Sequence, residues 1–191
     1  MTITITAAII AAIAPQPRLG ATSVAEALDA ALPEYEIDTP ARVAACLAQL
    51  AHESAGFRTT VEYADGKAYE GRLDLGNTQA GDGPRFRGRG LIQITGRANY
   101  VRAGKALGVD LIAHPDALEE IDLAAASAAW FWRYGSGTDL NPFADVLDGE
   151  VTFRGRAMPA FEAITRVING GVNGLDSRRE YWRRARRVLG V

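Results

Sequence analysis

The chain is poor in the residues that most often hold metals and disulfide bonds. Its 191 residues contain one cysteine and two histidines. One cysteine excludes an internal disulfide framework and a cysteine-rich zinc site, and two histidines leave little for a metal cluster. We therefore expect no metal and no cofactor, so that any chemistry would depend on carboxylates and polar side chains.

The chain also lacks an excess of positive charge. It has 21 basic and 23 acidic residues, which give a net charge of −2. Nucleic-acid-binding proteins usually carry a large positive excess, so we expect no nucleic-acid partner. The distribution is uneven, because residues 177–191 contain six arginines and one acid, Glu180. This segment is expected either to make weak contact with an anionic surface or to be a solvated helix face.

No apolar run is long enough to span a membrane. The longest candidate, residues 1–14, ends at Pro15 and has no Lys or Arg before its apolar part. A membrane-spanning helix needs about 20 apolar residues, and a signal peptide has a charged start. We therefore expect no signal peptide, and interpret this segment as a buried first helix capped by Thr4 or Thr6.

The rest of the pattern is mainly helical. Asp38 and Thr39 offer caps before Pro40, which suits the first position of a helix. The apolar periodicity and the stop residues predict helices over 23–32, 40–54, 99–107, 122–134, 159–168 and 177–189. The glycine-rich residues 56–90 predict a long loop region or short irregular strands, residues 91–95 a short strand, and residues 141–155 another loop. The expected fold class is therefore mainly α (α+β), with a helical core and a small irregular or β lobe.

Glu53 is the first candidate for chemistry. It lies at the expected C-terminus of an apolar helix, where the helix dipole and partial burial both favour the protonated carboxylic acid. A carboxylic acid that stays protonated near neutral pH can act as a general acid. An ordinary exposed glutamate at a helix end is the alternative.

A second carboxylate would have to come from the following loop. Hydrolysis of a glycosidic bond with inversion needs an acid and a base about 6.5–9.5 Å apart, with room for a water molecule. Glu62, nine residues after Glu53, fits this requirement, and so do Asp65 and Glu70. Spacing alone does not choose among the three.

Several runs of sequence resemble glycoside hydrolase family 19, which contains chitinases and many phage endolysins. They are distributed over roughly residues 51–187, a span of nearly three quarters of the chain, and their sequences are most similar to the phage and prophage endolysin branch. The runs are Ala51-His52-Glu53-Ser54, Tyr69-Glu70-Gly71-Arg72, Asp74-Leu75-Gly76-Asn77-Thr78, Gly81-Asp82-Gly83, Phe86 to Tyr100, Ile164 to Gly171, and Asn173-Gly174-Leu175.

The resemblance implies roles for the catalytic residues. Glu53 matches the general acid, and Thr95 matches a hydroxyl that helps to hold the attacking water. In the endolysin branch the second carboxylate lies nine residues after the acid, which is Glu62 here. In plant-type chitinases the base lies further along, beyond a longer loop.

The resemblance also implies substrate-binding residues, each with a structural alternative. Gln93 and Asn99 match sugar-binding positions, and Tyr69 is either a sugar platform or a packing aromatic. Asn169 and Arg178 match positions that orient the substrate or the acid. Gln93 could instead satisfy backbone groups, Asn169 could be the left-handed residue that ends its helix, and Arg178 could be a solvated arginine.

Two further residues close to these runs have structural interpretations. His52 is expected to support the acid by hydrogen bonding. Glu70 is expected to form a loop-stabilising ion pair with Arg72 in preference to a catalytic role.

These implications define an expected function. The length of 191 residues predicts one domain, or one domain with a small lobe. The family resemblance implies that this domain, residues 1–191, is catalytic and has a lysozyme-like fold, and we expect no separate cell-wall-binding module. We expect a monomeric endolysin, muramidase-like or lysozyme-like, that cleaves the β-1,4 glycosidic bond of bacterial peptidoglycan by an inverting acid/base mechanism. It would be made in the cytoplasm of a bacterial host and would act in the periplasm or cell wall after release.

Two alternatives remain open. The same site could act on chitin oligomers, or the chain could be an inactive glycan-binding module. The short chain, its lack of the cysteine pattern of secreted chitinases and its missing export signal favour peptidoglycan, whereas the acidic pI of about 5.7 is unusual for a lysin.

Overall fold

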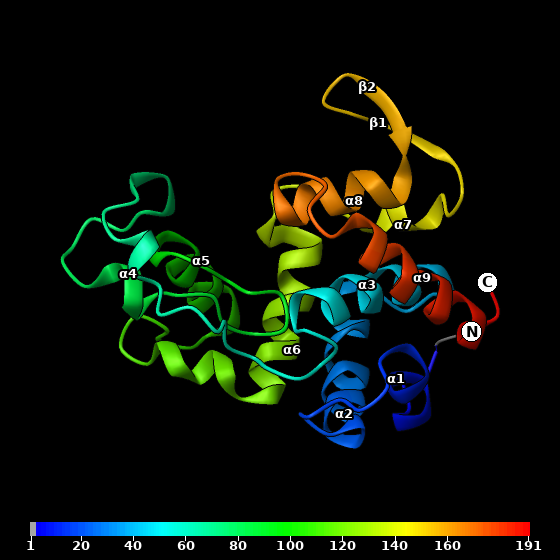
Figure 1. Ribbon diagram of the computed structural model, residues 1–191, viewed down its shortest axis with the longest axis horizontal. Helices are drawn as coiled ribbons and strands as arrows, with labels where there is room; N and C mark the ends of the chain where they lie inside the picture. The colour runs from blue at the N-terminus through cyan, green and yellow to red at the C-terminus, as the bar shows by residue number, and fades with distance from the viewer. Residues whose placement is uncertain (1–2) are drawn as a thin grey trace.

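The computed structural model describes residues 3–191, which form two lobes joined by α6 (Figure 1). The larger lobe holds most of the helices and a two-stranded hairpin, and the smaller lobe holds α4, α5 and much irregular chain. The helices are α1 Ala7–Ile13, α2 Ala21–Ala31, α3 Pro40–Glu53, α4 Asp82–Arg85, α5 Arg97–Leu107, α6 Ile121–Trp130, α7 Asn141–Asp145, α8 Ala160–Asn169 and α9 Leu175–Leu189. The strands are β1 Glu150–Phe153 and β2 Arg156–Pro159. The prediction of a mainly α (α+β) fold is confirmed.

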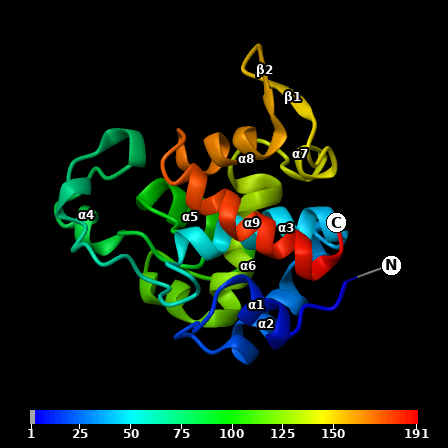
Figure 2. The same cartoon turned by 45° about the vertical axis from the view of Figure 1, so that its right-hand side comes forward.

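Helix α3 forms the centre of the larger lobe. Thr39 caps it by accepting a hydrogen bond from the backbone N–H of Arg42 at 3.3 Å, and Pro40 occupies its first turn. Every residue from 43 to 51 is buried, so the helix is covered on all sides. Helix α9 lies along it and supplies its largest packing surface (Figure 2). Glu53, the last residue of α3, is thereby held on a rigid element.

The first helix is shorter and more exposed than the sequence predicted. Thr6, and not Thr4, is its cap, because the Thr6 hydroxyl accepts from the backbone N–H of Ile9 at 3.4 Å. Residues 3–6 precede it without regular secondary structure, and only Ile10 and Ile13 within it are buried. The predicted helical residues 1 and 2 lie outside the described part of the chain.

Two expectations about β structure and loops are wrong. Residues 91–93 form a turn, with Gln93 in a left-handed conformation at φ 60°, and Ile94 makes only a single β-bridge, to Arg89, so residues 91–95 are not a strand. Leu91 and Ile94 are apolar because the turn is buried between neighbouring elements, and a short apolar run does not distinguish these cases. Residues 141–155, predicted as a loop, contain α7 and β1. In the described residues the only sheet is therefore the β1–β2 hairpin of the larger lobe.

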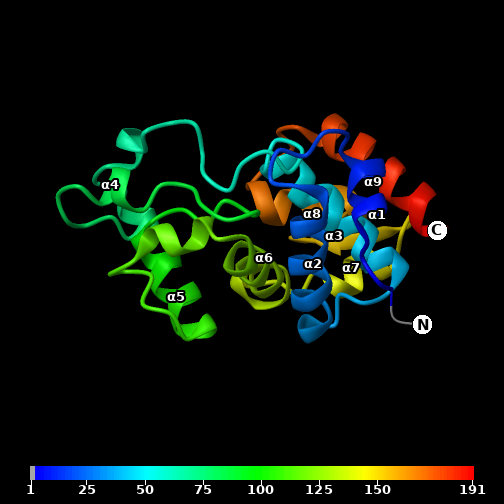
Figure 3. The same cartoon turned by 90° about the horizontal axis from the view of Figure 1, so that it is seen from below.

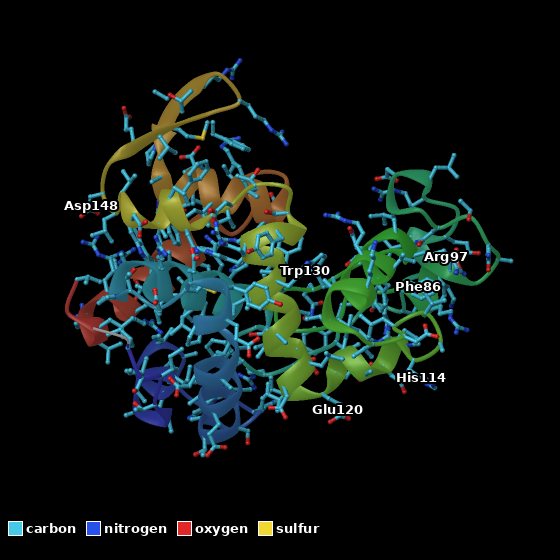
Figure 4. The ribbon with its side chains drawn as sticks, turned by 180° about the vertical axis from the view of Figure 1, so that it is seen from behind. Phe86, Arg97, His114, Glu120, Trp130 and Asp148 are labelled. Carbon is cyan, nitrogen blue, oxygen red and sulfur yellow. The ribbon has the colours of Figure 1, made fainter. Side chains whose placement is uncertain are left out.

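The smaller lobe lies on one side of α6 (Figure 3), and polar contacts as well as buried apolar side chains such as Phe86 hold it together. Buried Asp82 pairs with Arg97, whose Nε lies 2.8 Å from Asp82 Oδ2, and Arg97 in turn covers the ring of Phe86 (Figure 4). Buried Arg89 donates to Glu119 at 2.8 Å. These contacts fix the irregular chain from which part of the candidate site is built.

Candidate active site

Glu53 stands where α3 ends and the chain reverses. Ser54 follows it, donates its hydroxyl to the carbonyl of Leu50 at 2.7 Å and accepts from the N–H of Phe57 at 3.0 Å. Ala55 and Gly56 then adopt left-handed conformations. The Glu53 side chain is 18% exposed, so its carboxylate is largely shielded yet still reaches solvent.

Arg178 of α9 is the main partner of Glu53. Its side chain is 1% exposed, and Nη2 forms an ion pair with Glu53 Oε1. Nη1 donates to Gln49 Oε1 at 2.5 Å, and Nε donates to the carbonyl of Asn173 at 3.3 Å. The structure thus places Arg178 against the candidate acid, and the alternative of a solvated arginine is wrong.

The pair is supported by a buried chain of hydrogen bonds. Gln49 Nε2 donates to Thr165 Oγ1 at 2.9 Å, and the Thr165 hydroxyl donates to the carbonyl of Phe161 at 3.1 Å. Gln49 and Thr165 are both fully buried. Sequence reasoning missed these two residues, although a glutamine one helical turn before Glu53 in an apolar run could have indicated the first.

His52, the residue before Glu53, contacts the start of α9. Its Nδ1 lies 3.1 Å from Ser177 Oγ, and its ring packs on Gly174, where a Cβ atom would come within 2.2 Å of His52 Cε1. Burial and the nearby Arg178 lower the pKa of His52. The hydrogen bond therefore fixes His52 to the first turn of α9, and does not join it to Glu53 directly.

Glu62 is placed by pairing between distant loop segments. Its backbone N–H donates to the carbonyl of Gly88 at 3.0 Å, beside single β-bridges that join Arg89 to Val61 and to Ile94. Its carboxylate accepts from the N–H of Gly88 at 3.1 Å and from the hydroxyl of Tyr69 at 2.9 Å. Glu62 is half-buried, and Tyr69 contacts this carboxylate.

Three candidate residues converge on Gly88. A Cβ atom at this glycine would lie 2.8 Å from Gln93 Oε1, 3.3 Å from Thr95 Oγ1 and 3.4 Å from Glu62 Oε2. The Thr95 hydroxyl donates to the carbonyl of Gln93 at 2.9 Å, and Gln93 Nε2 donates to the carbonyl of Gly90 at 2.9 Å. Gly88 therefore leaves the space around which Glu62, Thr95 and Gln93 gather.

Asn99 and Asn169 are less closely tied to the carboxylates. Asn99 Nδ2 donates to the backbone carbonyl of Thr95 at 2.8 Å, so Asn99 contacts the backbone of Thr95. Asn169 is exposed at the end of α8, and its Nδ2 lies 3.5 Å from the carbonyl of Asn173. The left-handed residue that ends α8 is Gly170, so that structural alternative for Asn169 is wrong.

The other two carboxylates considered as bases have structural partners. Asp65 is exposed and pairs with Lys67 at 2.8 Å. Both Glu70 oxygens accept from backbone amides, that of Gly81 at 2.7 Å and that of Gly83 at 2.8 Å. The expected pair between Glu70 and Arg72 is wrong, because the guanidinium of Arg72 binds Asp74.

Two absences in the described residues bear on other kinds of function. Within residues 3–191, no three His, Cys, Asp or Glu side chains are grouped so that they could hold a metal ion. In the same residues, no helix combines the length and apolar character needed to cross a membrane.

Comparison with known proteins identifies the family. The model of glycoside hydrolase family 19, described as chitinase class I, matches residues 19–191. The match covers most of the chain, including Glu53, Glu62 and the segment around Gly88. The protein therefore belongs to glycoside hydrolase family 19, a family of glycosidase enzymes.

Individual relatives agree with this assignment. A glycosyl hydrolase family 19 domain-containing protein of Haemophilus influenzae is 38% identical over 117 residues, which are 61% of this chain and 49% of the relative. An acidic endochitinase of Petunia hybrida is 34% identical over 164 residues, which are 78% of this chain and 62% of the relative. The chain thus spans about half to three fifths of the length of these relatives.

Solved structures share the fold. A bacterial family 19 chitinase has a TM-score of 0.74 at 23% identity, over 99% of this chain and 96% of the other. Chitinase C of Streptomyces griseus has a TM-score of 0.70 at 22% identity, over 98% of this chain and 77% of the other. The predicted lysozyme-like fold of the family is confirmed.

Proposed function

We propose that the chain hydrolyses the β-1,4 glycosidic bond of peptidoglycan, as an endolysin-type enzyme with an inverting mechanism. The observation that carries the proposal is the gathering of Glu62, Thr95 and Gln93 around Gly88, together with Glu53 at the end of α3. Hydrolysis with inversion needs these two halves: a shielded acid, and a base with a place for water.

Glu53 acts as the acid. It gives its proton to the leaving glycosidic oxygen and becomes a carboxylate. The buried Arg178 guanidinium stabilises the negative charge that remains, through a charge-assisted hydrogen bond. Gln49 and the carbonyl of Asn173 hold that guanidinium in place, so the pair is positioned before the substrate binds.

Glu62 and Thr95 act on the water. The Thr95 hydroxyl already donates to the carbonyl of Gln93, so its oxygen is left to accept a hydrogen bond from water. Glu62 accepts the other water proton as the bond to the sugar forms. The amide of Gly88 and the hydroxyl of Tyr69 orient the Glu62 carboxylate for this step.

Glu62 is preferred as the base over Asp65 and Glu70 because of its surroundings. It is half-buried and lies beside Thr95, whereas Asp65 is exposed and bound to Lys67. Glu70 already uses both oxygens to bind backbone amides that hold the loop around α4.

Peptidoglycan is proposed as the polymer because the loop motifs at Tyr69–Asn77 and Gly81–Gly83 resemble the endolysin branch. Action on this polymer would place the enzyme in the periplasm or cell wall, after release from the bacterial cytoplasm, as a monomer. Chitin is the second candidate, because the relative from Petunia hybrida is named an endochitinase. A glycan-binding module without activity is the third.

The deciding experiment is product analysis on purified peptidoglycan and on chitin oligomers by mass spectrometry. We expect disaccharide-containing products with N-acetylmuramic acid at the reducing end from peptidoglycan, at a higher rate than any products from chitin. Faster cleavage of chitin would show that chitin, and not peptidoglycan, is the preferred substrate. Binding to either polymer without products would support an inactive glycan-binding module.

The carboxylates are tested by Glu53→Gln, Glu62→Gln and Glu70→Gln. Loss of an acid or base typically lowers the rate by about 10²–10⁴-fold, so the first two variants should lose most lysis of permeabilised bacteria. Glu70→Gln is the matched control and should affect mainly stability. Undiminished lysis by Glu53→Gln would refute the assignment of Glu53 as the acid. Loss of activity in Glu70→Gln alone, at unchanged stability, would refute the assignment of Glu62 as the base.

A further inference from the structure

A cavity of about 480 Å³ lies between the β1–β2 hairpin and one side of α8. This volume is within the range of about 300–1,000 Å³ that is usual for ligand sites. The charged residues of its lining are Arg154, Arg156, Glu162 and Arg166. Three guanidinium groups therefore face one carboxylate.

That carboxylate is already neutralised by protein groups. Glu162 Oε1 accepts from Arg166 Nε at 3.0 Å and from Arg166 Nη2 at 2.9 Å. Glu162 Oε2 also lies 3.7 Å from Nη2 of Arg179 on α9. The cavity thus keeps an excess of positive charge that comes from the hairpin.

Arg154 and Arg156 supply this excess. Both side chains belong to exposed residues, and no carboxylate among residues 3–191 lies within 4.0 Å of either guanidinium. Arg154 instead lies over the ring of Phe153, at 5.1 Å from its centroid. An arginine on an aromatic face keeps its planar edge free to bind a carboxylate through two hydrogen bonds.

The hairpin turn gives Arg154 an unusual position. Phe153 pairs with Arg156, so the loop consists of Arg154 and Gly155, with φ of 51° and 76°. Two-residue turns with both residues in this region favour Asn-Gly or Gly-Gly. An arginine occupies a place where asparagine would fold more readily, which is consistent with a function for its side chain.

The cavity is connected to the candidate active site by one short loop. Gly170 lines it and directly follows Asn169, a candidate for substrate binding. The loop continues to Asn173, whose carbonyl accepts from the Arg178 that holds Glu53. A glycan bound at Asn169 would therefore lie next to Gly170, a residue of the cavity lining.

We infer that this cavity binds carboxylates of the peptide stem attached to the glycan, through Arg154 and Arg156. The inference rests on the proposed function, since chitin is neutral and carries no stem. It deepens that proposal by assigning the selection of stem-bearing wall polymer to the hairpin.

The test is the double variant Arg154→Gln/Arg156→Gln, assayed on soluble peptidoglycan fragments with intact stems. We expect KM to rise about tenfold and kcat to stay nearly unchanged, because the cavity binds the substrate away from the reacting bond. The matched control, Arg18→Gln/Lys105→Gln, removes the same charge from exposed residues elsewhere and should leave KM unchanged. Thermal unfolding of both variants checks that the fold is kept.

Two further substrates isolate the stem. On fragments whose stems have been removed by an amidase, and on chitin oligomers, the double variant should behave like the wild type. An equal rise of KM on stem-free fragments, or no rise on stem-bearing ones, would overturn the inference.

Direct binding separates this inference from the proposed reaction. Calorimetric titration with a synthetic stem tetrapeptide should show binding to the wild type that the double variant loses, even if no glycosidic bond is cleaved. The same peptide with amidated carboxyl groups should not bind. Equal binding of the amidated peptide, or tighter binding of glycerol phosphate than of the tetrapeptide, would refute the assignment to stem carboxylates.

Discussion

At the scale of single residues, Gly88 provides the space on which the base half of the site depends. Its φ is not in the left-handed region, so alanine is compatible with its backbone. The added Cβ would nevertheless stand 2.8 Å from Gln93 Oε1 and within 3.4 Å of both Thr95 Oγ1 and Glu62 Oε2. Because flexible side-chain ends must then move, the change affects the site more than the fold.

We therefore expect Gly88→Ala to lower kcat by up to about 100-fold, since a shift of about 1 Å in a catalytic group can have that effect. Turnover of peptidoglycan fragments measures it, and thermal unfolding should change little. Gly171→Ala is the control, because no atom lies within 4 Å of its Cβ position and its φ is also compatible. Equal activity of the two variants would show that the space at Gly88 is not used.

His52 gives a pH dependence of stability. Burial and Arg178 lower its pKa below the usual value of 6.5, so the unfolded chain binds this proton more readily than the folded one. The stabilisation is complete above about pH 6.5 and is lost as the pH falls through the lowered folded-state pKa. In His52→Gln, denaturant unfolding between pH 7 and 5 should show a weaker loss of stability than in the wild type. An unchanged slope would mean that other groups cause the dependence.

At the scale of elements, the sequence predicted those with local start and stop residues. Thr39 and Pro40 mark the start of α3, and Gly170 marks the end of α8, so both helices and the position of Glu53 could be predicted. The β1–β2 hairpin could not, because its strands are four residues long and lie mostly on the surface. The family resemblance, and not local pattern, pointed to Thr95 and Arg178.

The placement of the site residues depends on non-local pairing. Arg178 reaches Glu53 across 125 positions of sequence, and Glu62 is fixed by Gly88, 26 positions away. Such pairings form only when α9 packs on α3 and when the loop segments of the smaller lobe meet. Sequence spacing therefore left Glu62, Asp65 and Glu70 as candidate bases. They differ in their hydrogen-bond partners, which only the folded structure shows.

The cap at the start of α3 gives a prediction about the stability of this helix. Thr39→Ala removes the side chain that accepts from the N–H of Arg42, and should lower the free energy of unfolding by about 1 kcal/mol. Thr39→Ser keeps the acceptor and should retain most of the stability. Urea denaturation measures both. If the two variants are equally destabilised, the methyl group of Thr39, and not its cap, is responsible.

At the scale of the whole molecule, the net charge of −2 conceals an uneven distribution. Six arginines lie in α9, but several have acidic partners. Glu180 binds Arg183 at 2.6 Å and Arg184 at 3.0 Å, and Asp148, labelled in Figure 4, binds Arg186 at 2.6 Å. Arg178 is committed to Glu53. The free positive charge of α9 is therefore smaller than its composition suggests.

These ion pairs limit the positive charge with which α9 can attract a negatively charged cell wall. Exchanging Arg183, Arg184, Arg186 and Arg187 for Gln removes four positive charges and leaves Glu180 and Asp148 without these partners. Since exposed charge pairs contribute about 0.2–1 kcal/mol each, we expect wall binding at low salt to weaken by about tenfold. Sedimentation with purified walls measures it, and the difference should shrink at high salt, where such interactions are screened. Binding that stays equal at low salt would show that α9 is a solvated face, and that attraction to the wall comes from elsewhere on the molecule.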